Sequence, residues 1–186
     1  MAQDKFPVLE SERLRLRKPG LRDVDRILEY ADNPKISEMT LSFPYPYHEE
    51  DAVSWLHTAY KGFQEGETYI FAICPKESDE FMGGISLNIK KEYNRAELGF
   101  WLAEPYWGRG YMTEALRQVL RFGFHNLELH KIYAVHFTNN PASGRVMAKN
   151  GMVREAQLKE HIRKDGRYRD LVQYRLTKME YEGGKE

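Results

Sequence analysis

The chain has 186 residues, of which 41% are hydrophobic and 30% are charged, so it is long enough for one globular domain with a full core. Lysine and arginine together number 28, as do aspartate and glutamate, and the formal net charge is zero. This balance argues against a general nucleic-acid or membrane binder, while it leaves a local basic patch open.

The single cysteine, Cys74, has no intrachain partner for a disulfide. No apolar run reaches about 18 residues, so no membrane-spanning helix is expected. Residues 1–5 lack the charged-then-apolar profile of a signal peptide, and we expect a cytoplasmic location. We also expect a single domain over residues 1–182, followed by a disordered tail at 183–186.

The first third of the chain predicts a strand, two helices and a loop. Residues 12–18 alternate leucine with arginine, which is typical of a half-exposed strand. Residues 21–33 have apolar side chains at helical spacing, and Asn33-Pro34 is expected to end that helix. Residues 42–47 are aromatic and proline-rich, which favours a loop, and three acidic residues at 49–51 favour the start of a second helix. The predicted apolar stripe of this second helix consists of Val53, Leu56, Tyr60 and Phe63.

Three strands are predicted next, over residues 68–74, 81–93 and 95–103. Asn94 marks a tight turn between the last two, and short turns between neighbouring strands predict an antiparallel meander. A helix over residues 112–128 and a strand over residues 131–137 follow, which predicts a right-handed parallel crossover from the preceding strand.

The last predicted elements are a short helix and a hairpin. The helix covers residues 142–149 and ends at Asn150-Gly151, a typical C-cap. Two strands then flank Asp165-Gly166, a typical two-residue hairpin turn. The sheet is therefore predicted to be mixed.

Residues 106–115 join the predicted strand at 95–103 to the predicted helix at 112–128. Gly108 and Gly110 leave the backbone N–H groups unshielded, and the start of the helix adds a partial positive charge. Arg109 puts a guanidinium at the same place, suited to phosphate oxygens. The turn thus predicts an anion-binding site, with a plain loop as the alternative.

Three segments, taken in order, resemble the GNAT-type acyl-CoA N-acyltransferases. They are residues 96–102 running into 107–111, residues 140–143 leading through Lys149 to 151–152, and residues 166–168 with Asp170 and Tyr174. The resemblance covers roughly residues 10–180 and is strongest to the branch that contains the ribosomal-protein N-terminal acetyltransferases, which also holds enzymes acting on other amines. It implies an α+β (mixed α/β) fold with a mostly antiparallel sheet of about seven strands flanked by about four helices.

The chain departs from the family pattern at three places. Trp107 stands where Gln or Arg is frequent, which matters little if backbone amides bind the ligand. Met112 stands where a small residue is common, so its bulk could obstruct the cofactor. Many relatives have a tyrosine acid in the helix after Asn140, whereas Val146 and Met147 here cannot donate a proton.

The resemblance implies acetyl-CoA as a co-substrate and no metal, and the cysteine and histidine residues show no metal-ligand pattern. The amides of residues 109–113 would cradle the pyrophosphate. The strands at 95–103 and 131–137 would splay apart, so that the pantetheine arm pairs with the backbone of residues 100–102 and the amide of Trp101 or Leu102 stabilises the oxyanion. The residues expected to bind the cofactor are Phe100, Trp101, Leu102, Trp107, Gly108, Arg109, Gly110, Tyr111, Met112, Thr113, Asn140 and Arg145.

Two residues are predicted to be catalytic, Glu97 and Ser143. Glu97 could accept the amine proton, because Gly99 leaves open space beside it; alternatively it is a structural carboxylate that pairs with a nearby arginine or with the arginines of the N-terminal strand. Ser143 could protonate the thiolate leaving group in place of the missing tyrosine, or only cap the helix. Asn140 could likewise bind the pantetheine amides or cap that helix, and Arg145 could bind a nucleotide phosphate or face solvent.

Other side chains are weaker candidates. Glu160 and His161, in the sixth predicted strand, could face the acceptor, although a lone histidine is usually structural. The aromatic residues of the 42–47 loop could form a wall for the acceptor or pack as an ordinary loop. Asp170 and Tyr174 are expected to organise the hairpin.

The sequence therefore predicts an acetyl-CoA-dependent N-acetyltransferase in which a deprotonated amine attacks the thioester directly. The expected acceptor is a protein or peptide N-terminus of the ribosomal-protein type, with a polyamine or another small amine as the alternative. A non-catalytic CoA-binding regulatory module, or an anion-binding domain of other chemistry, is the rival of a different class. No nucleic-acid or membrane partner is expected, and a homodimer stays open.

Overall fold

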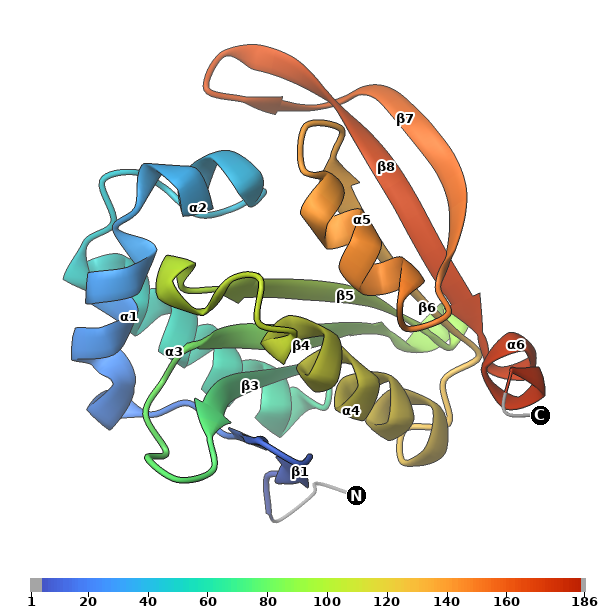
Figure 1. Ribbon diagram of the computed structural model, residues 1–186, viewed down its shortest axis with the longest axis horizontal. Helices are drawn as coiled ribbons and strands as arrows, with labels where there is room; N and C mark the ends of the chain where they lie inside the picture. Colours follow the sequence, from blue (N-terminus) through green and yellow to red (C-terminus); the bar gives the residue numbers. More distant parts are fainter. Residues whose placement is uncertain (1–4, 185–186) are drawn as a thin grey trace.

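The computed structural model describes residues 5–184. Residues 1–4, where no signal peptide was expected, and residues 185–186 of the expected tail lie outside the described part. One mixed sheet has eight strands in the order β1-β2-β3-β4-β5-β6-β8-β7 (Figure 1). The strands are β1 (Leu9–Glu10), β2 (Leu14–Arg17), β3 (Thr68–Pro75), β4 (Gly83–Lys90), β5 (Arg95–Leu102), β6 (Lys131–Phe137), β7 (Val153–Lys164) and β8 (Arg167–Thr177). The fold class is confirmed, and the strand beyond the expected seven is β1, a two-residue edge strand.

Six helices flank this sheet in the described part of the chain. They are α1 (Val24–Ala31), α2 (Pro34–Met39), α3 (Glu49–Glu65), α4 (Tyr111–His125), α5 (Pro141–Ala148) and α6 (Lys178–Gly183). The short helices α2 and α6 were not predicted, and because α6 includes Gly183, the expected boundary of the tail lies inside a helix. No helix among the described residues is long and apolar enough to cross a membrane.

Asn33-Pro34 does more than end a helix, which corrects the sequence-based expectation. The Asn33 side chain accepts a hydrogen bond from the Lys35 amide at 2.9 Å, so it caps a new helix, and Pro34 occupies the first position of α2. Proline fits there because its missing N–H would lack an intrahelical partner anyway. The pair therefore separates α1 from α2, and α2 brings Met39 toward the functional site described below.

The predicted apolar stripe of α3 is wrong in two of its four residues, since Val53 is 48% and Tyr60 is 55% exposed. The helix instead turns small residues to the sheet, among them Ala52, Ala59 and Gly62. A Cβ on Gly62 would lie 2.6 Å from the Thr68 Cβ, so α3 can approach β3 this closely only with glycine there. Close approach of the helix thus adds to the contact of Phe63, which is buried as predicted and packs against Tyr69.

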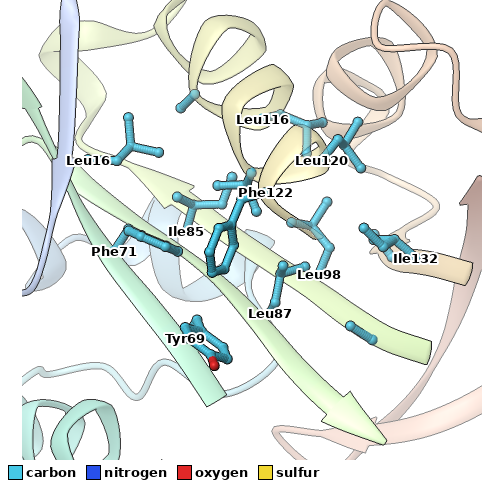
Figure 2. Packing of buried hydrophobic residues seen from close by; sticks show 14 of the residues in the cluster. Leu16, Tyr69, Phe71, Ile85, Leu87, Leu98, Leu116, Leu120, Phe122 and Ile132 are labelled. Carbon is cyan, nitrogen blue, oxygen red and sulfur yellow. The ribbon is translucent and has the colours of Figure 1, made fainter. Parts of the chain in front are cut away.

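Two hydrophobic clusters cover the two faces of the sheet. The larger one packs α4 against β3, β4, β5 and β6, and Figure 2 shows the Phe122 ring beside Phe71, with Leu116 and Leu120 of the same helix higher in the view. The smaller one lies under α1, α2 and α3. Strand β5 contributes to both by alternation, since Leu98 belongs to the first cluster and Trp101 to the second.

The strands β5 and β6 separate after their first residues. Strand β5 pairs with β4 over its whole length, from Arg95 to Leu102, in an antiparallel register. It pairs with β6 in parallel, as predicted, but only at Arg95, Ala96 and Glu97. Helix α5 and the β7–β8 hairpin lie on the far side of this separation (Figure 1). Residues 98–102 of β5 therefore have one edge that is not paired with a neighbouring strand.

Candidate active site

The glycine turn before α4 has the geometry of an anion site. Gly108 and Gly110 have φ values of 73° and 79°, which are strained for residues with a side chain. Helix α4 begins at Tyr111, so the amides of Tyr111, Met112 and Thr113 have no acceptor one turn earlier in the helix. These N–H groups and the helix dipole favour a bound anion, which is consistent with the predicted cradle.

The two unusual side chains of this turn leave the amides accessible. Met112 is 7% exposed and packs in the larger core cluster, so its bulk points away from the cradle that it was expected to obstruct. The Trp107 indole N–H donates to the Leu102 carbonyl at 2.6 Å, which fastens the turn to the end of β5. Met112 thus anchors the turn in the core, and Trp107 anchors it to β5.

Arg13, which directly precedes β2, reaches the cradle and was missed by the sequence analysis. Its guanidinium forms an ion pair with Glu114 at 2.6 Å, lies 4.5 Å from the centre of the Tyr111 ring and donates to the Arg109 carbonyl at 3.2 Å. Burial works against ionisation of Glu114, but hydrogen bonds from Arg13 and Ser11 outweigh it and lower the pKa of the carboxyl. The alternation of arginine and leucine indicated a strand and gave no signal of this long-range contact.

Beyond Glu97, the backbone amides of β5 point alternately toward β4 and toward the open edge of the strand. The Ala103 amide donates to the Met82 carbonyl, and bonding residues alternate along an antiparallel pair, so the odd-numbered residues of β5 face β4. The even-numbered residues Leu98, Phe100 and Leu102 therefore direct their amides to the open edge. Of the two amides expected at the oxyanion, that of Leu102 faces this edge, whereas that of Trp101 belongs to the ladder with β4.

A cavity of about 250 Å³ lies where β5 and β6 separate. Both faces of β5 contribute to its wall, since Leu98 and Phe100 belong to one face and Glu97 and Trp101 to the other. The other lining residues are Met39, Thr40, Leu41, Ser42, Phe43, Trp55, Ile70, Gly84, Ile85, Ser86, Asn88, Gly99, Val135, His136, Phe137 and Ser143. The cavity thus joins the two sides of the sheet, and both predicted catalytic residues line it.

Glu97 is partly buried beside the open strand edge. Its Oε2 accepts a hydrogen bond from the Tyr133 hydroxyl at 3.3 Å, and both burial and the charge of Glu97 raise the pKa of that tyrosine. The arginines of β2 bind other carboxylates: Arg15 pairs with Glu10, and Arg17 pairs with Asp23 and Asp79. The ion pair of the structural alternative is therefore not found with β2 in the described part of the chain.

Ser143 and Asn140 form one hydrogen-bonded unit at the start of α5. The Asn140 Oδ1 accepts from the Ser143 amide at 3.3 Å, which fixes the side chain so that its Nδ2 donates to the Ser143 Oγ at 3.0 Å. Asn140 is thus a helix cap, as one of its two predicted roles required. Because the Ser143 oxygen already accepts a hydrogen bond, its own proton is available for donation into the cavity.

Two buried polar atoms of the cavity lining have no partner among the described residues, namely the Trp101 Nε1 and the His136 Nε2. Each of the two side chains is 7% exposed. The His136 Nδ1 lies 2.7 Å from the Phe137 carbonyl and so carries the proton, which leaves Nε2 as an acceptor. Burial lowers the pKa of His136. The sequence analysis did not find His136, because its strand has an ordinary buried pattern.

The remaining candidates lie apart from the cavity or shape its wall. Arg145, Glu160 and His161 are exposed, and none of the three lines the cavity. Phe43 does line it, stacked on the buried Tyr47 at 5.4 Å, so the aromatic loop is both packed and part of the wall. Asp170 accepts from the Glu160 amide at 2.8 Å, which agrees with its expected role in organising the hairpin.

Lys164 connects the tip of the hairpin to the wall of the cavity. Its ammonium donates to the backbone carbonyls of Ser37, Thr40 and Phe43, the last two of which belong to cavity-lining residues. Burial lowers the pKa of Lys164. The side chain therefore holds the end of α2 and the following loop against the β7–β8 hairpin, a contact without a local sequence signal.

Comparison with known proteins agrees with this geometry. A model of the acetyltransferase (GNAT) domain matches residues 13–153. The uncharacterized N-acetyltransferase p20 of Bacillus licheniformis is 30% identical over 178 residues, which are 94% of this chain and 98% of that protein. The ribosomal protein uS5-alanine N-acetyltransferase of Escherichia coli is 25% identical over 185 residues, 95% of this chain and 94% of the relative.

A solved structure of RimL, described as a ribosomal L7/L12 α-N-protein acetyltransferase in complex with coenzyme A, superposes with a TM-score of 0.83. Its sequence is 22% identical, and the match covers 92% of this chain and 98% of RimL, so the likeness shows a shared fold. The family match covers well over half of the chain, including the glycine turn, the open edge of β5 and the start of α5. The chain therefore belongs to the GNAT acetyltransferase family.

Proposed function

We propose that the protein transfers an acetyl group from acetyl-CoA to the N-terminal amine of a peptide or protein. The observation that carries this proposal is the cavity through the sheet, with Glu97 and Ser143 in its wall and the open edge of β5 between them. A relative named for the alanine of ribosomal protein uS5 and a structural neighbour named for ribosomal L7/L12 support the choice of acceptor.

The cradle residues would hold the pyrophosphate of acetyl-CoA through the amides of Tyr111, Met112 and Thr113, with the guanidinium of Arg109 nearby. The pantetheine arm would pair with the open backbone of Phe100 like an added strand. This arrangement would bring the thioester into the cavity, where one of the amides that face the open edge, those of Leu98, Phe100 and Leu102, would stabilise the negative charge that develops on the carbonyl oxygen.

Glu97 would act as the general base and Ser143 as the general acid. An amine is mainly protonated near neutral pH, so Glu97 would accept its proton directly or through water before the nitrogen attacks the thioester carbon. The new C–N bond forms while the C–S bond breaks, and the nitrogen loses its second proton to water. Ser143 would donate its proton to the leaving thiolate and would take up a proton from water in its place. The Tyr133 hydroxyl would orient the Glu97 carboxylate through the hydrogen bond to Oε2.

The test is release of free CoA and gain of an acetyl mass when the protein is mixed with acetyl-CoA and a panel of amines. We expect turnover of peptides with a free N-terminus to be faster than turnover of spermidine, because zero net charge offers little attraction for a polycation. Tight CoA binding without turnover of any amine would instead indicate the non-catalytic module. Equal or faster acetylation of spermidine would indicate the small-amine alternative.

A further inference from the structure

The Trp101 indole N–H is a donor held inside the cavity without an acceptor among the described residues. A buried donor that stays unpaired costs about 1–3 kcal/mol, so proteins rarely retain one without a role. The other orphan atom, the His136 Nε2, lies on the α5 side, where a Cβ on Gly144 would approach it to 2.9 Å. The two atoms therefore face different sides of the sheet, and Trp101 shares its side with Glu97.

The floor of the cavity on this side consists of three cross-strand pairs between β4 and β5. They are Gly84–Trp101, Ser86–Gly99 and Asn88–Glu97, and all six residues line the cavity. A Cβ on Gly99 would meet only the Ser86 hydroxyl within 4 Å, so the middle of the floor is open. The floor is thus a trough with a carboxylate at one end and an indole N–H at the other.

The indole is fixed in position by its neighbours. The rings of Phe43 and Phe81 lie 5.1 and 5.6 Å from the Trp101 ring. A Cβ on Gly84 would lie 2.9 Å from the Trp55 Cζ2 and 3.1 Å from the Trp101 Nε1, so only glycine leaves room for both indole rings at this end of the trough. An N–H held rigidly in an apolar wall makes a strong hydrogen bond with a correctly placed acceptor and penalises a ligand that lacks one.

We propose that Trp101 is a specificity-determining residue whose Nε1–H donates to a backbone carbonyl oxygen near the reacting amine of the acceptor. The inference rests on the proposed function, and it places the amine over the open middle of the trough at Gly99, within reach of Glu97 directly or through water. Gly99 lies two residues from Glu97 on one side and two residues from Trp101 on the other. Two residues of a strand span about 7 Å, the separation of Gly99 from Trp101, and an extended peptide advances about 3.5 Å per residue. The first or second carbonyl of a peptide can therefore reach the indole, whereas a polyamine has no oxygen to offer.

The experiment is a cycle of two enzymes and two acceptors. Trp101→Phe keeps an aromatic ring and removes the N–H, and alanyl-alaninamide is compared with a carbonyl-free primary alkylamine of similar length. We expect the wild-type preference for the peptide amide, measured as the ratio of kcat/KM values, to fall at least tenfold in Trp101→Phe, mainly through the KM of the peptide. Comparing ratios removes the intrinsic reactivity of each amine.

Trp55→Phe is the matched control, since Trp55 also lines the cavity and its nitrogen is not among the orphan atoms. Its ratio of kcat/KM values should stay within twofold of the wild type. Gly84→Ala provides a second variant, because its methyl group would crowd the Trp101 Nε1 as well as the Trp55 ring, and it should lower the preference in the same direction as Trp101→Phe.

Two results would overturn the inference while leaving the proposed function intact. One is an equal loss for both acceptors in Trp101→Phe and Gly84→Ala, which would make Trp101 a packing residue only. The other is a wild-type enzyme that acetylates the alkylamine as well as the peptide amide. If the wild type binds CoA but acetylates no amine, the proposed function fails, and the assignment of Trp101 fails with it.

Discussion

The cradle at the start of α4 and the cavity between β5 and β6 are neighbours on one sheet, but they are built from different parts of the polypeptide. The cradle consists of backbone amides from one short segment, and its side chains are either exposed, as in Arg109, or turned into the core, as in Met112. The cavity wall is built from side chains contributed by α2, α3, β3, β4, β5, β6 and α5. An amide cradle suits a ligand that never changes, whereas a wall of side chains can be altered to fit different acceptors.

The largest difference between the cavity and the cradle is expected for Glu97→Gln, a change in the cavity wall alone. The variant keeps the size of the side chain and the contact with Tyr133 but loses the basic charge, so the rate should fall about 10²-fold or more at pH 7. The loss should shrink at high pH, where the amine loses its proton unaided, and CoA affinity should stay within twofold. Steady-state kinetics over pH 6–9 would measure both quantities.

The control for this experiment is Glu160→Gln, which makes the same change on an exposed residue outside the cavity. Its rate should match the wild type. A folded Glu97→Gln protein with unchanged turnover would falsify the assignment of the base. The rate of Glu160→Gln would then show whether Glu160 is the base, and His161 would be tested next.

A smaller effect is expected for Ser143→Ala, because a thiolate leaves readily even without a proton donor. We expect kcat to fall about tenfold or more, at the weak end of acid–base effects, with the KM of acetyl-CoA nearly unchanged. Ser42→Ala is the matched control, since Ser42 is a second serine in the cavity wall. Equal losses in the two variants would show that Ser143 is not the proton donor.

The glycine turn and the start of α4 could be predicted because their signal is contiguous. Two glycines, an arginine and a helix start lie within a few residues, and no distant contact is needed to recognise them. The same holds for β6, whose predicted and observed bounds agree. Glu97 and Ser143 could be named because family motifs surround them, and alternation along β5 put Glu97 on the correct face.

The acceptor wall could be predicted only in part because its contacts are long-range. Nothing near Lys164 in the sequence indicates that its ammonium binds carbonyls more than 120 residues earlier in the chain. The orientation of α3 depends on the close contact of Gly62 with Thr68, which helical spacing does not encode. The orphan atoms of Trp101 and His136 likewise become visible only when every neighbour has been located.

The cradle itself is tested by Gly110→Val. A β-branched residue at a φ of 79° is strained and would also shield the amides, so CoA affinity should fall at least tenfold, or about 1.4 kcal/mol. Gly166→Val is matched for backbone strain, with a φ of 76° at the hairpin turn away from the cradle. Isothermal titration with CoA should show the loss in the first variant alone, and normal binding by folded Gly110→Val would locate the cradle elsewhere.

The smallest expected effect is on the stability of the fold rather than on the rate, and it concerns His136 of the cavity wall. Burial and the charge of Arg154 hold the pKa of His136 below its ordinary value of about 6.5, although the hydrogen bond to the Phe137 carbonyl opposes them. As pH falls, the His136 imidazole therefore becomes protonated in the unfolded chain before it does so in the folded protein. Neutral His136 stabilises the fold above about pH 6.5, and this stabilisation is lost as pH falls further.

Replacing His136 with Gln should flatten this dependence by up to about 1.4 kcal/mol per pH unit, the limit for one proton. Urea unfolding of both proteins at pH 7.5 and 5.5 would measure it. The wild type should lose more free energy of unfolding between these values than His136→Gln does. Parallel losses would show that another group controls the acid sensitivity.

The bridge made by Lys164 also has a consequence for how the protein is synthesised. The residues of the cradle leave the ribosome before the hairpin exists, whereas Thr40 and Phe43 must wait for a lysine that comes late in the chain. The wall that selects the acceptor is therefore the last part of the site to be completed. A nascent chain that stops short of Lys164 retains the segment for the cofactor and lacks the means to hold the acceptor wall in place.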